Sequence, residues 1–268
     1  MTQTYRYIFA VLSLFIFGMT YIPPALAQAE AKMMTYQDGK TTLEGYWSPS
    51  KCFNKSPMPV VLIVHQWRGL GDHEKNVADK VAELCYHAFA IDVYGQGVRP
   101  ANDDLAKVES DKYRNDPKLA LRRLNVAREF AGKQPGVDSQ RMLAMGYCFG
   151  GGLVLDWARS GADLKGVVSF HGNLNARIPA ASTPKASILV HNGADDPYVS
   201  SAELAGFMDE MRALKADWML TQYSGAVHAF TQVGAGNDPS KGFAYNEKAD
   251  NRSWSSTTEF LMAALSRE

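Results

Sequence analysis

The sequence has few cysteines, no excess of charge of either sign and no low-complexity tract. Three cysteines in 268 residues are too few for a small disulfide-built module or for a zinc module with several cysteine ligands. The 28 basic and 28 acidic residues give a net charge of zero, so the composition offers no basic footprint for nucleic acid and no polybasic membrane patch. Disordered and fibrous classes are excluded as well. An ordinary folded enzyme or binding protein remains.

Residues 1–27 have the pattern of a secretory signal peptide. Arg6 supplies a short positive region, residues 8–19 are apolar, and residues 25–27 form an Ala-x-Ala cleavage pattern after two prolines. The alternative is an uncleaved membrane anchor, but about a dozen apolar residues span a bilayer poorly. We expect an exported protein, periplasmic if the source is a Gram-negative bacterium, with no stable membrane anchor after processing.

Residues 28–268 alternate between segments with the patterns of strands and of helices. We expect strands at residues 33–47 (edge hairpin strands), 59–65, 88–94, 141–147, 166–171, 186–191 and 218–223. We expect helices at residues 76–84, 117–131, 201–214 and 253–265, and a helix of about ten residues that follows residues 148–152. The polar residues 95–116 are expected to form a long loop, with Asp116 as N-cap of the next helix. This alternation predicts a single α/β domain with a mostly parallel central sheet and helices on both faces.

A turn between an expected strand and an expected helix carries a catalytic motif. Residues 146–150 read Gly-Tyr-Cys-Phe-Gly, which is the nucleophile elbow of α/β-hydrolases with Cys148 in place of serine. The glycines leave room where the strand and the helix crowd together, and the helix N-terminus favours a thiolate. The alternative is that Cys148 is a small buried side chain beside an ordinary glycine-rich turn.

Two more motifs follow later strands in the order that such hydrolases use. Asp196 stands in the turn after residues 186–191, and His228 stands on the loop after the last expected strand. We choose Asp196 because the acid of this arrangement usually stands directly before proline, which leaves Asp195 as a turn residue. The order nucleophile, acid, histidine differs from the orders of chymotrypsin and subtilisin. We therefore predict Cys148, Asp196 and His228 as the catalytic residues.

With these motifs the sequence resembles the dienelactone hydrolase family over essentially all of residues 28–268, and its exported members in particular. The resemblance is carried by residues 64–70 (VHQWRGL), 92–95 (DVYG), 146–151 (GYCFGG) and 226–231 (AVHAFT). It implies the α/β-hydrolase fold and a cysteine hydrolase of ester or lactone bonds that works through a thioester, without metal or cofactor. It further implies that the backbone N–H groups of Phe149 and Trp67 form the oxyanion hole.

The expected substrate pocket departs from the family pattern. We assign to it Gln66, Tyr94, Gln96, His171 and Phe230. The family has a glutamate at the position of Gln66, where an amide cannot act as a base, and substrate-binding arginines at the positions of Gln96 and Gln232. We therefore expect a small-molecule ester or lactone other than dienelactone itself. Arg68 or Arg99 is a candidate replacement for the missing arginines, although a solvated surface charge is the more frequent role. His171 has a structural role as its alternative.

The two other cysteines are expected at the sheet edge opposite to Cys148. In an oxidising compartment we expect a disulfide between Cys52 and Cys85, with two free thiols as the alternative. No cluster of His, Asp and Glu predicts a metal site. A non-catalytic small-molecule binding protein on the same fold is the alternative function, because Gln66 could mark a disabled site. We expect a monomer or small homo-oligomer.

Overall fold

A mixed sheet forms the centre of the computed structural model, which describes residue 1 and residues 30–52, 57–180 and 182–266. The predicted signal peptide lies outside these residues apart from its first position. The strand order is β1-β2-β4-β3-β5-β6-β7-β8, with β1 and β2 antiparallel and the strands from β4 to β8 parallel. The strands are β1 (Lys32–Asp38), β2 (Thr41–Ser48), β3 (Met58–Val64), β4 (His87–Ile91), β5 (Val137–Tyr147), β6 (Gly166–Phe170), β7 (Ser187–Gly193) and β8 (Trp218–Tyr223).

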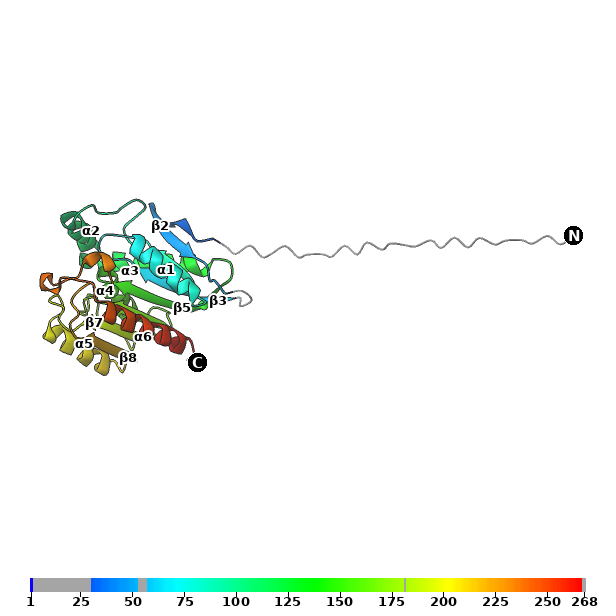
Figure 1. The fold of residues 1–268 in the computed structure, drawn as a ribbon. Helices are drawn as coiled ribbons and strands as arrows, with labels where there is room; N and C mark the ends of the chain where they lie inside the picture. The colour runs from blue at the N-terminus through cyan, green and yellow to red at the C-terminus, as the bar shows by residue number, and fades with distance from the viewer. Residues whose placement is uncertain (2–29, 53–56, 181, 267–268) are drawn as a thin grey trace.

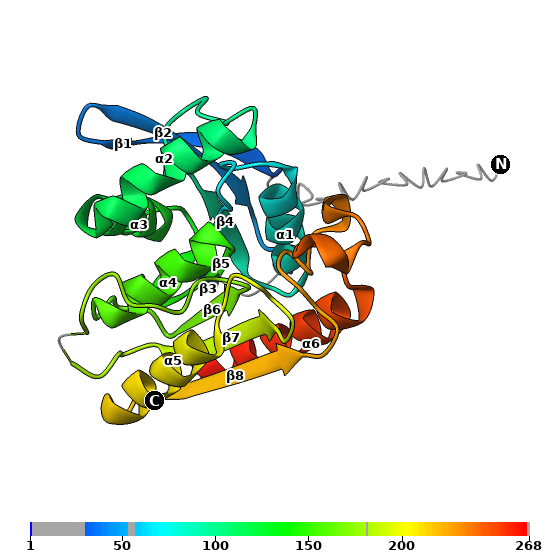
Figure 2. The ribbon, with the colours of Figure 1, turned by 90° about the vertical axis from the view of Figure 1, so that its left-hand side faces the viewer.

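Helices cover both faces of this sheet, as Figures 1 and 2 show. Helices α1 and α6 lie on one face, and α3, α4 and α5 lie on the other, with α2 packed against α3. The helices are α1 (Asp72–Glu83), α2 (Asp103–Asn115), α3 (Pro117–Gly132), α4 (Phe149–Arg159), α5 (Ser201–Ala213) and α6 (Glu247–Leu265), with two short 3₁₀ helices, η1 (Val233–Ala235) and η2 (Pro239–Lys241). The expected fold class, an α/β-hydrolase fold, is confirmed.

Strand β3 explains why the central strands are continuous apolar runs. Its residues Val60, Leu62 and Val64 belong to the core beneath α3, α4 and α5, whereas Val61 and Ile63 belong to the core beneath α1 and α6. All five side chains are fully buried. Because successive side chains point to opposite faces, a strand covered on both sides has no position for a polar residue.

Helix α2 corrects the expectation of a long loop over residues 95–116. Its N-cap is Asn102, whose side chain accepts a hydrogen bond from the Leu105 N–H at 2.9 Å. Most of the helix is polar and only Ala106, Ser110 and Tyr113 are buried, so it has little of the apolar periodicity that predicts a helix. The sequence signal that indicates α2 is its N-cap residue, Asn102.

Three elements begin at least four residues earlier than expected, and caps explain two of them. Strand β5 starts at residue 137 instead of 141. Helix α1 starts at residue 72 instead of 76, because the Glu74 carboxylate accepts the N–H of Gly71 at the helix start. Helix α6 starts at residue 247 instead of 253, where the Asn246 side chain accepts the N–H of Ala249. Polar first turns conceal both helix starts from a search for apolar spacing.

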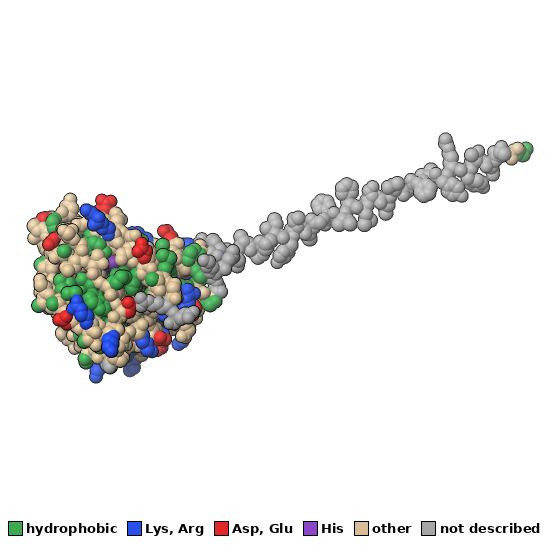
Figure 3. Space-filling view, turned by 90° about the horizontal axis from the view of Figure 1, so that it is seen from below, with side chains coloured by type: hydrophobic (Ala, Val, Ile, Leu, Met, Phe, Trp, Pro, Cys, Tyr) green, Lys and Arg blue, Asp and Glu red, His purple; other side chains and the backbone are tan. Residues whose placement is uncertain are grey.

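Charges of both signs are interspersed on the face of the molecule that Figure 3 shows, with hydrophobic side chains between them. This distribution agrees with the net charge of zero. Within residues 30–52, 57–180 and 182–266, no helix combines the length and the apolar character that crossing a membrane requires.

Candidate active site

The turn between β5 and α4 holds Cys148 in a strained backbone conformation. Its φ and ψ angles are 53° and −114°, which a non-glycine residue rarely adopts. Crowding accounts for the glycines on either side. A Cβ on Gly146 would lie 2.2 Å from the carbonyl oxygen of Gly150, and a Cβ on Gly150 would lie 2.3 Å from that of Val64. Glycine at both positions therefore lets the turn pack against the end of β3.

Three predicted side chains meet at the carboxyl edge of the sheet. The Nε2 atom of His228 lies 3.1 Å from the Sγ atom of Cys148, and its Nδ1 atom lies 2.9 Å from Oδ2 of Asp196. The other carboxylate oxygen of Asp196 accepts the Tyr198 N–H at 2.8 Å, and this carboxylate is buried. Asp195 instead accepts a backbone N–H and lies in the turn, as expected. The geometry is that of a nucleophile, a base and an orienting acid.

The charges of these groups favour proton transfer from sulfur to imidazole. Burial raises the pKa of the Cys148 thiol, but the positive charge and hydrogen bond of His228, the Phe149 N–H and Arg114 lower it below its usual value. Burial lowers the pKa of His228, but Cys148 and Asp196 together raise that pKa to about 10. Both directions favour a thiolate paired with an imidazolium at neutral pH.

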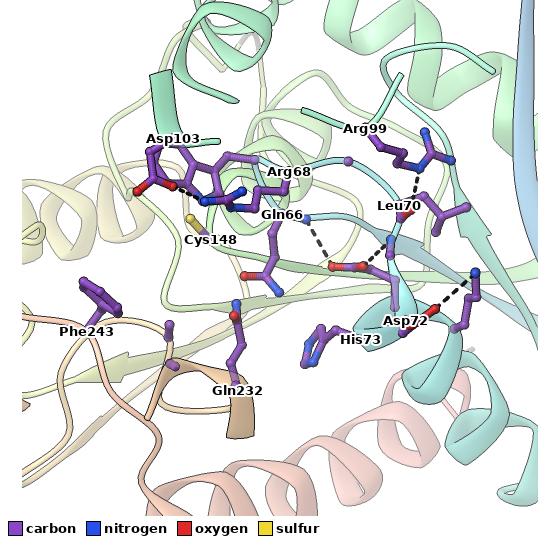
Figure 4. A pocket seen from close by; sticks show the side chains of 18 of the residues that line it. Gln66, Arg68, Leu70, Asp72, His73, Arg99, Asp103, Cys148, Gln232 and Phe243 are labelled. Atoms are coloured by element: carbon purple, nitrogen blue, oxygen red, sulfur yellow. Dashed lines mark hydrogen bonds and ion pairs between the residues drawn. The ribbon is translucent and has the colours of Figure 1, made fainter. Parts of the chain in front are cut away.

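A cavity of about 1120 Å³ opens above these side chains. Its walls come from the loop after β3 and the first turn of α1, from α2, and from the loops after β4, β6, β7 and β8. Figure 4 shows Gln66, Arg68 and Gln232 around the sulfur of Cys148. The volume exceeds the usual range of about 300–1,000 Å³ for small-molecule pockets. The cavity therefore has room for an ester larger than a short-chain acetate.

Gln66 lines this cavity, but the other four predicted pocket residues are not among its lining residues. Tyr94 is buried, and its hydroxyl donates to the Trp67 carbonyl at 2.9 Å. Gln96 is exposed and donates to Glu44 at 3.1 Å. These two side chains are held by neighbours beside the cavity, so their assignment to the pocket wall was wrong.

His171 and Phe230 form a second layer beneath His228. His171 is fully buried, its ring lies 5.0 Å from the ring of His228, and its Nε2 lies 2.9 Å from Oγ1 of Thr231. Burial and the neighbouring His228 hold the pKa of His171 well below its usual value, so its ring is neutral. Phe230 is fully buried with its ring 5.3 Å from that of His171. Both support the site from behind instead of lining it.

The predicted oxyanion donors lie on the two loops that border Cys148. Trp67 lines the cavity, and its backbone N–H has no hydrogen-bond partner in the part of the chain that the structure describes. Phe149 directly follows Cys148, and its backbone N–H lowers the pKa of the thiol. Both predicted donors are backbone N–H groups at the carboxyl edge of the sheet.

The cavity also contains residues that the sequence did not single out. Arg114 of α2 lines it, with its guanidinium 5.4 Å from the centre of the Phe149 ring. Tyr198 and Phe243 are exposed aromatic residues at its wall. Arg114 was not predicted as a site residue because residues 95–116, which contain α2, were expected to form a loop. No local motif marks the two aromatic residues.

Cys52 and Cys85 are joined in a disulfide with a Cα–Cα distance of 5.1 Å. They precede β3 and β4, at the edge of the sheet opposite to the cavity. The sequence left two free thiols as the alternative to a disulfide, and the structure contains the disulfide. Cys148 is the free cysteine, so a redox role for it lacks a resolving partner. Among the described ranges, no group of three His, Cys, Asp or Glu side chains could hold a metal ion.

Comparisons with known proteins agree on one family. The model of the dienelactone hydrolase family matches residues 45–265. A solved dienelactone hydrolase-like promiscuous phosphotriesterase from metagenomic libraries is 33% identical, with a TM-score of 0.82 over 87% of this chain and 98% of its own. A probable 2-oxo-3-(5-oxofuran-2-ylidene)propanoate lactonase of Bradyrhizobium is 26% identical over 76% of this chain and 83% of its own. A dienelactone hydrolase of Anabaena variabilis, 18% identical with a TM-score of 0.65 over 88% of this chain and 98% of its own, shares the fold.

Proposed function

We propose that this chain, which belongs to the dienelactone hydrolase family and hydrolyses ester or lactone bonds, cleaves them with a triad of Cys148, His228 and Asp196. The observation that carries the proposal is the continuous line of contacts from Sγ through the imidazole to the carboxylate, at 3.1 Å and 2.9 Å. The lowered pKa of Cys148 supports the thiolate as nucleophile, because burial is outweighed by the positive charge of His228.

The proposed reaction has two half-reactions. The Cys148 thiolate attacks the carbonyl carbon, and the Phe149 and Trp67 N–H groups stabilise the negative oxygen of the tetrahedral intermediate. Protonated His228 donates its proton to the leaving alkoxide, which departs as the alcohol and leaves a thioester on Cys148. His228 then takes a proton from water, the hydroxide attacks the thioester, and the carboxylic acid and the thiolate are released. Asp196 stabilises the imidazolium in both half-reactions.

The charges around the cavity favour an uncharged ester or lactone over a carboxylate-bearing dienelactone. Glu44 lines the cavity and accepts a hydrogen bond from Gln96, so an acidic group stands beside one family arginine position, and Gln232 occupies the other. Each arginine of the lining already has an acidic neighbour: Arg68 has Asp103, Arg99 has Asp92, and Arg114 has Asp111. A second anion entering the cavity gains little from such neutralised cations.

The proposed setting is outside the cytoplasm. The pattern of residues 1–27 and the pairing of Cys52 with Cys85 both suit an exported protein in an oxidising compartment, which is the periplasm if the source is Gram-negative. We further propose that it acts as a single α/β-hydrolase domain over residues 28–268, as a monomer or small homo-oligomer.

Hydrolysis of a graded panel of substrates tests this function. The panel contains p-nitrophenyl esters of increasing acyl length and lactones, each with and without a carboxylate. The wild-type protein is expected to hydrolyse uncharged members faster than charged ones. Cys148→Ala is expected to lower kcat by about 10⁴ or more, because it removes the nucleophile. Wild-type rates equal to those of Cys148→Ala, with ligand binding retained, would instead favour the non-catalytic binding protein.

Mass spectrometry of the quenched reaction tests the thioester directly. The wild-type protein is expected to gain the mass of the acyl group during turnover and to lose it in neutral hydroxylamine, which cleaves thioesters. Cys148→Ala is the control and is expected to gain nothing. Acylation that persists in Cys148→Ala would place the nucleophile on another residue.

A further inference from the structure

The loop of residues 66–71 connects β3 to α1 and carries Trp67, the proposed oxyanion donor. The carbonyl of Gln66 lies 2.6 Å from Nδ1 of His65 and accepts the N–H of Gly69 at 3.1 Å. In a trans peptide the N–H points away from the preceding carbonyl, so these contacts also orient the N–H of Trp67. Tyr94 holds the next carbonyl, that of Trp67, at 2.9 Å. The direction of one backbone N–H thus depends on how firmly this loop is held.

Glu74 supplies two of the contacts that hold the loop. Its Oε1 atom accepts the N–H of Gln66 at 3.3 Å, and its Oε2 atom accepts the N–H of Gly71 at 2.9 Å. The carboxylate thereby joins the first and last residues of the loop. Only 2% of Glu74 is exposed, and no Lys or Arg within the described ranges pairs with it. Burying a carboxylate without a cation costs free energy, and the two hydrogen bonds from loop N–H groups offset part of that cost.

We propose that Glu74 is a positioning residue of the hydrolysis, whose carboxylate fixes residues 66–71 so that the Trp67 N–H meets the oxyanion. The inference rests on the proposed function, because it presupposes the attack of Cys148 on a carbonyl. Glu74 is among the residues that line the cavity, but within the described residues it has no hydrogen bond to Cys148 or His228. It acts on the transition state through the loop, so its removal lowers kcat more than it raises KM.

A second glutamate provides a matched control. Glu203 is also the third residue of its helix, α5, and its Oε1 also accepts two loop N–H groups, those of Leu174 and Asn175. Its loop carries no proposed oxyanion donor. Glu74→Gln and Glu203→Gln each replace a carboxylate that holds a loop with an amide that has a single acceptor oxygen, and only the loop of residues 66–71 carries a proposed oxyanion donor.

The test compares ester hydrolysis with alkylation of Cys148 by iodoacetamide. Alkylation needs the thiolate and His228 but no oxyanion hole. Glu74→Gln is expected to lower kcat about 10–100-fold, since losing one oxyanion donor costs about 10²–10³ and the loop retains other contacts. KM and the alkylation rate are expected to change less than about threefold. Glu203→Gln is expected to leave kcat within about twofold while lowering Tm.

Unchanged kcat in Glu74→Gln would overturn the proposal, as would a parallel fall in kcat and alkylation, which indicates general damage to the site. If Glu74→Gln does not fold, Tyr94→Phe tests the same loop, because it removes the hydroxyl that holds the Trp67 carbonyl. That variant is expected to lower kcat with KM and alkylation unchanged, and unchanged kcat would overturn the proposal. Failure of the proposed function is distinct: the wild-type protein would hydrolyse esters no faster than Cys148→Ala.

Discussion

Five described residues other than glycine have a positive φ angle, and they divide between the two edges of the sheet. Cys85 and Lys215 lie at the edge opposite to the cavity, each directly after the C-cap residue of a helix, α1 or α5. Cys148, His171 and Ala229 lie at the catalytic edge beside the cavity, and none of them follows a helix. A positive φ angle therefore occurs in two different settings.

The difference lies in what the side chain does. After a helix, a left-handed residue ends the hydrogen-bond ladder, and glycine is the usual choice there. At the catalytic edge the side chains carry the site: Cys148 supplies the sulfur, His171 packs against His228, and Ala229 follows His228. A left-handed non-glycine residue costs about 1–2 kcal/mol. At one edge the positive φ angle follows a helix end, whereas at the other it occurs at Cys148 and in residues beside His228.

After Cys148→Ala, Asp196→Asn should have the largest effect at the catalytic edge. An amide does not stabilise the imidazolium of His228 and can hold its ring in the wrong tautomer, so kcat is expected to fall by about 10²–10⁴. Steady-state hydrolysis of a p-nitrophenyl ester measures the loss. Asp195→Asn in the same turn is the control and is expected to keep kcat within about twofold, because one oxygen still accepts the Gly225 N–H. Equal losses in both variants would contradict the assignment of the acid.

At the opposite edge, removing the disulfide should have the largest effect. It should lower the free energy of unfolding but leave activity nearly unchanged. The bond closes a loop with a sequence separation of 33 residues, and the chain-entropy model gives about 3–4 kcal/mol for a loop of this length. The double variant Cys52→Ala, Cys85→Ala is expected to lose that much free energy of unfolding, measured by urea denaturation, while kcat stays within about twofold. A large fall in kcat of the folded variant would show that the two edges are coupled.

The pH dependence of Cys148 alkylation should separate the ion pair from an ordinary thiol. Because His228 lowers the pKa of Cys148, alkylation is expected to extend to lower pH than that of an ordinary thiol and to decline only as the pH falls through the lowered pKa. Above about pH 10 His228 loses its proton, so alkylation continues while hydrolysis declines for lack of a proton donor. In His228→Gln the thiol pKa rises, and alkylation is expected to begin at higher pH. Identical profiles for both proteins would exclude the ion pair.

Glycine substitutions should give the smallest effects and the sharpest contrast between the edges. Lys215→Gly is expected to raise the free energy of unfolding by about 1 kcal/mol without changing kcat, because it relieves strain at a helix end. Ala229→Gly relieves similar strain but loosens the backbone next to His228, so kcat is expected to fall about 3–10-fold. Thermal denaturation and steady-state kinetics measure both variants. A fall in kcat in Lys215→Gly equal to that in Ala229→Gly would remove the distinction.

The central fold follows from local patterns in the sequence. The apolar run of β3 predicts a strand covered on both faces, and Asp116 before Pro117 predicts the start of α3, where the Asp116 side chain accepts the Leu119 N–H. Both signals depend on residues close together in the chain. Helix α2 was missed because its few buried residues give little apolar periodicity.

Local sequence patterns likewise predict one part of the candidate site and miss another. Cys148, Asp196 and His228 each stand in a motif after a strand, and parallel strands bring such motifs to one edge. The pocket wall has no such motif. Tyr94 and Phe230 lie within segments that carry the family resemblance, yet both side chains are buried, whereas Arg114 and Phe243 reach the cavity from segments without a sequence signal.

The order of residues along the chain determined the sheet, the family and the three side chains that meet at its edge, because strand periodicity and turn chemistry are local properties. Tertiary structure decided which side chains face the cavity and whether Cys52 and Cys85 lie close enough to form the expected disulfide. Those outcomes depend on distances between segments 30 or more residues apart, and such distances are set by how helices and loops pack on the sheet.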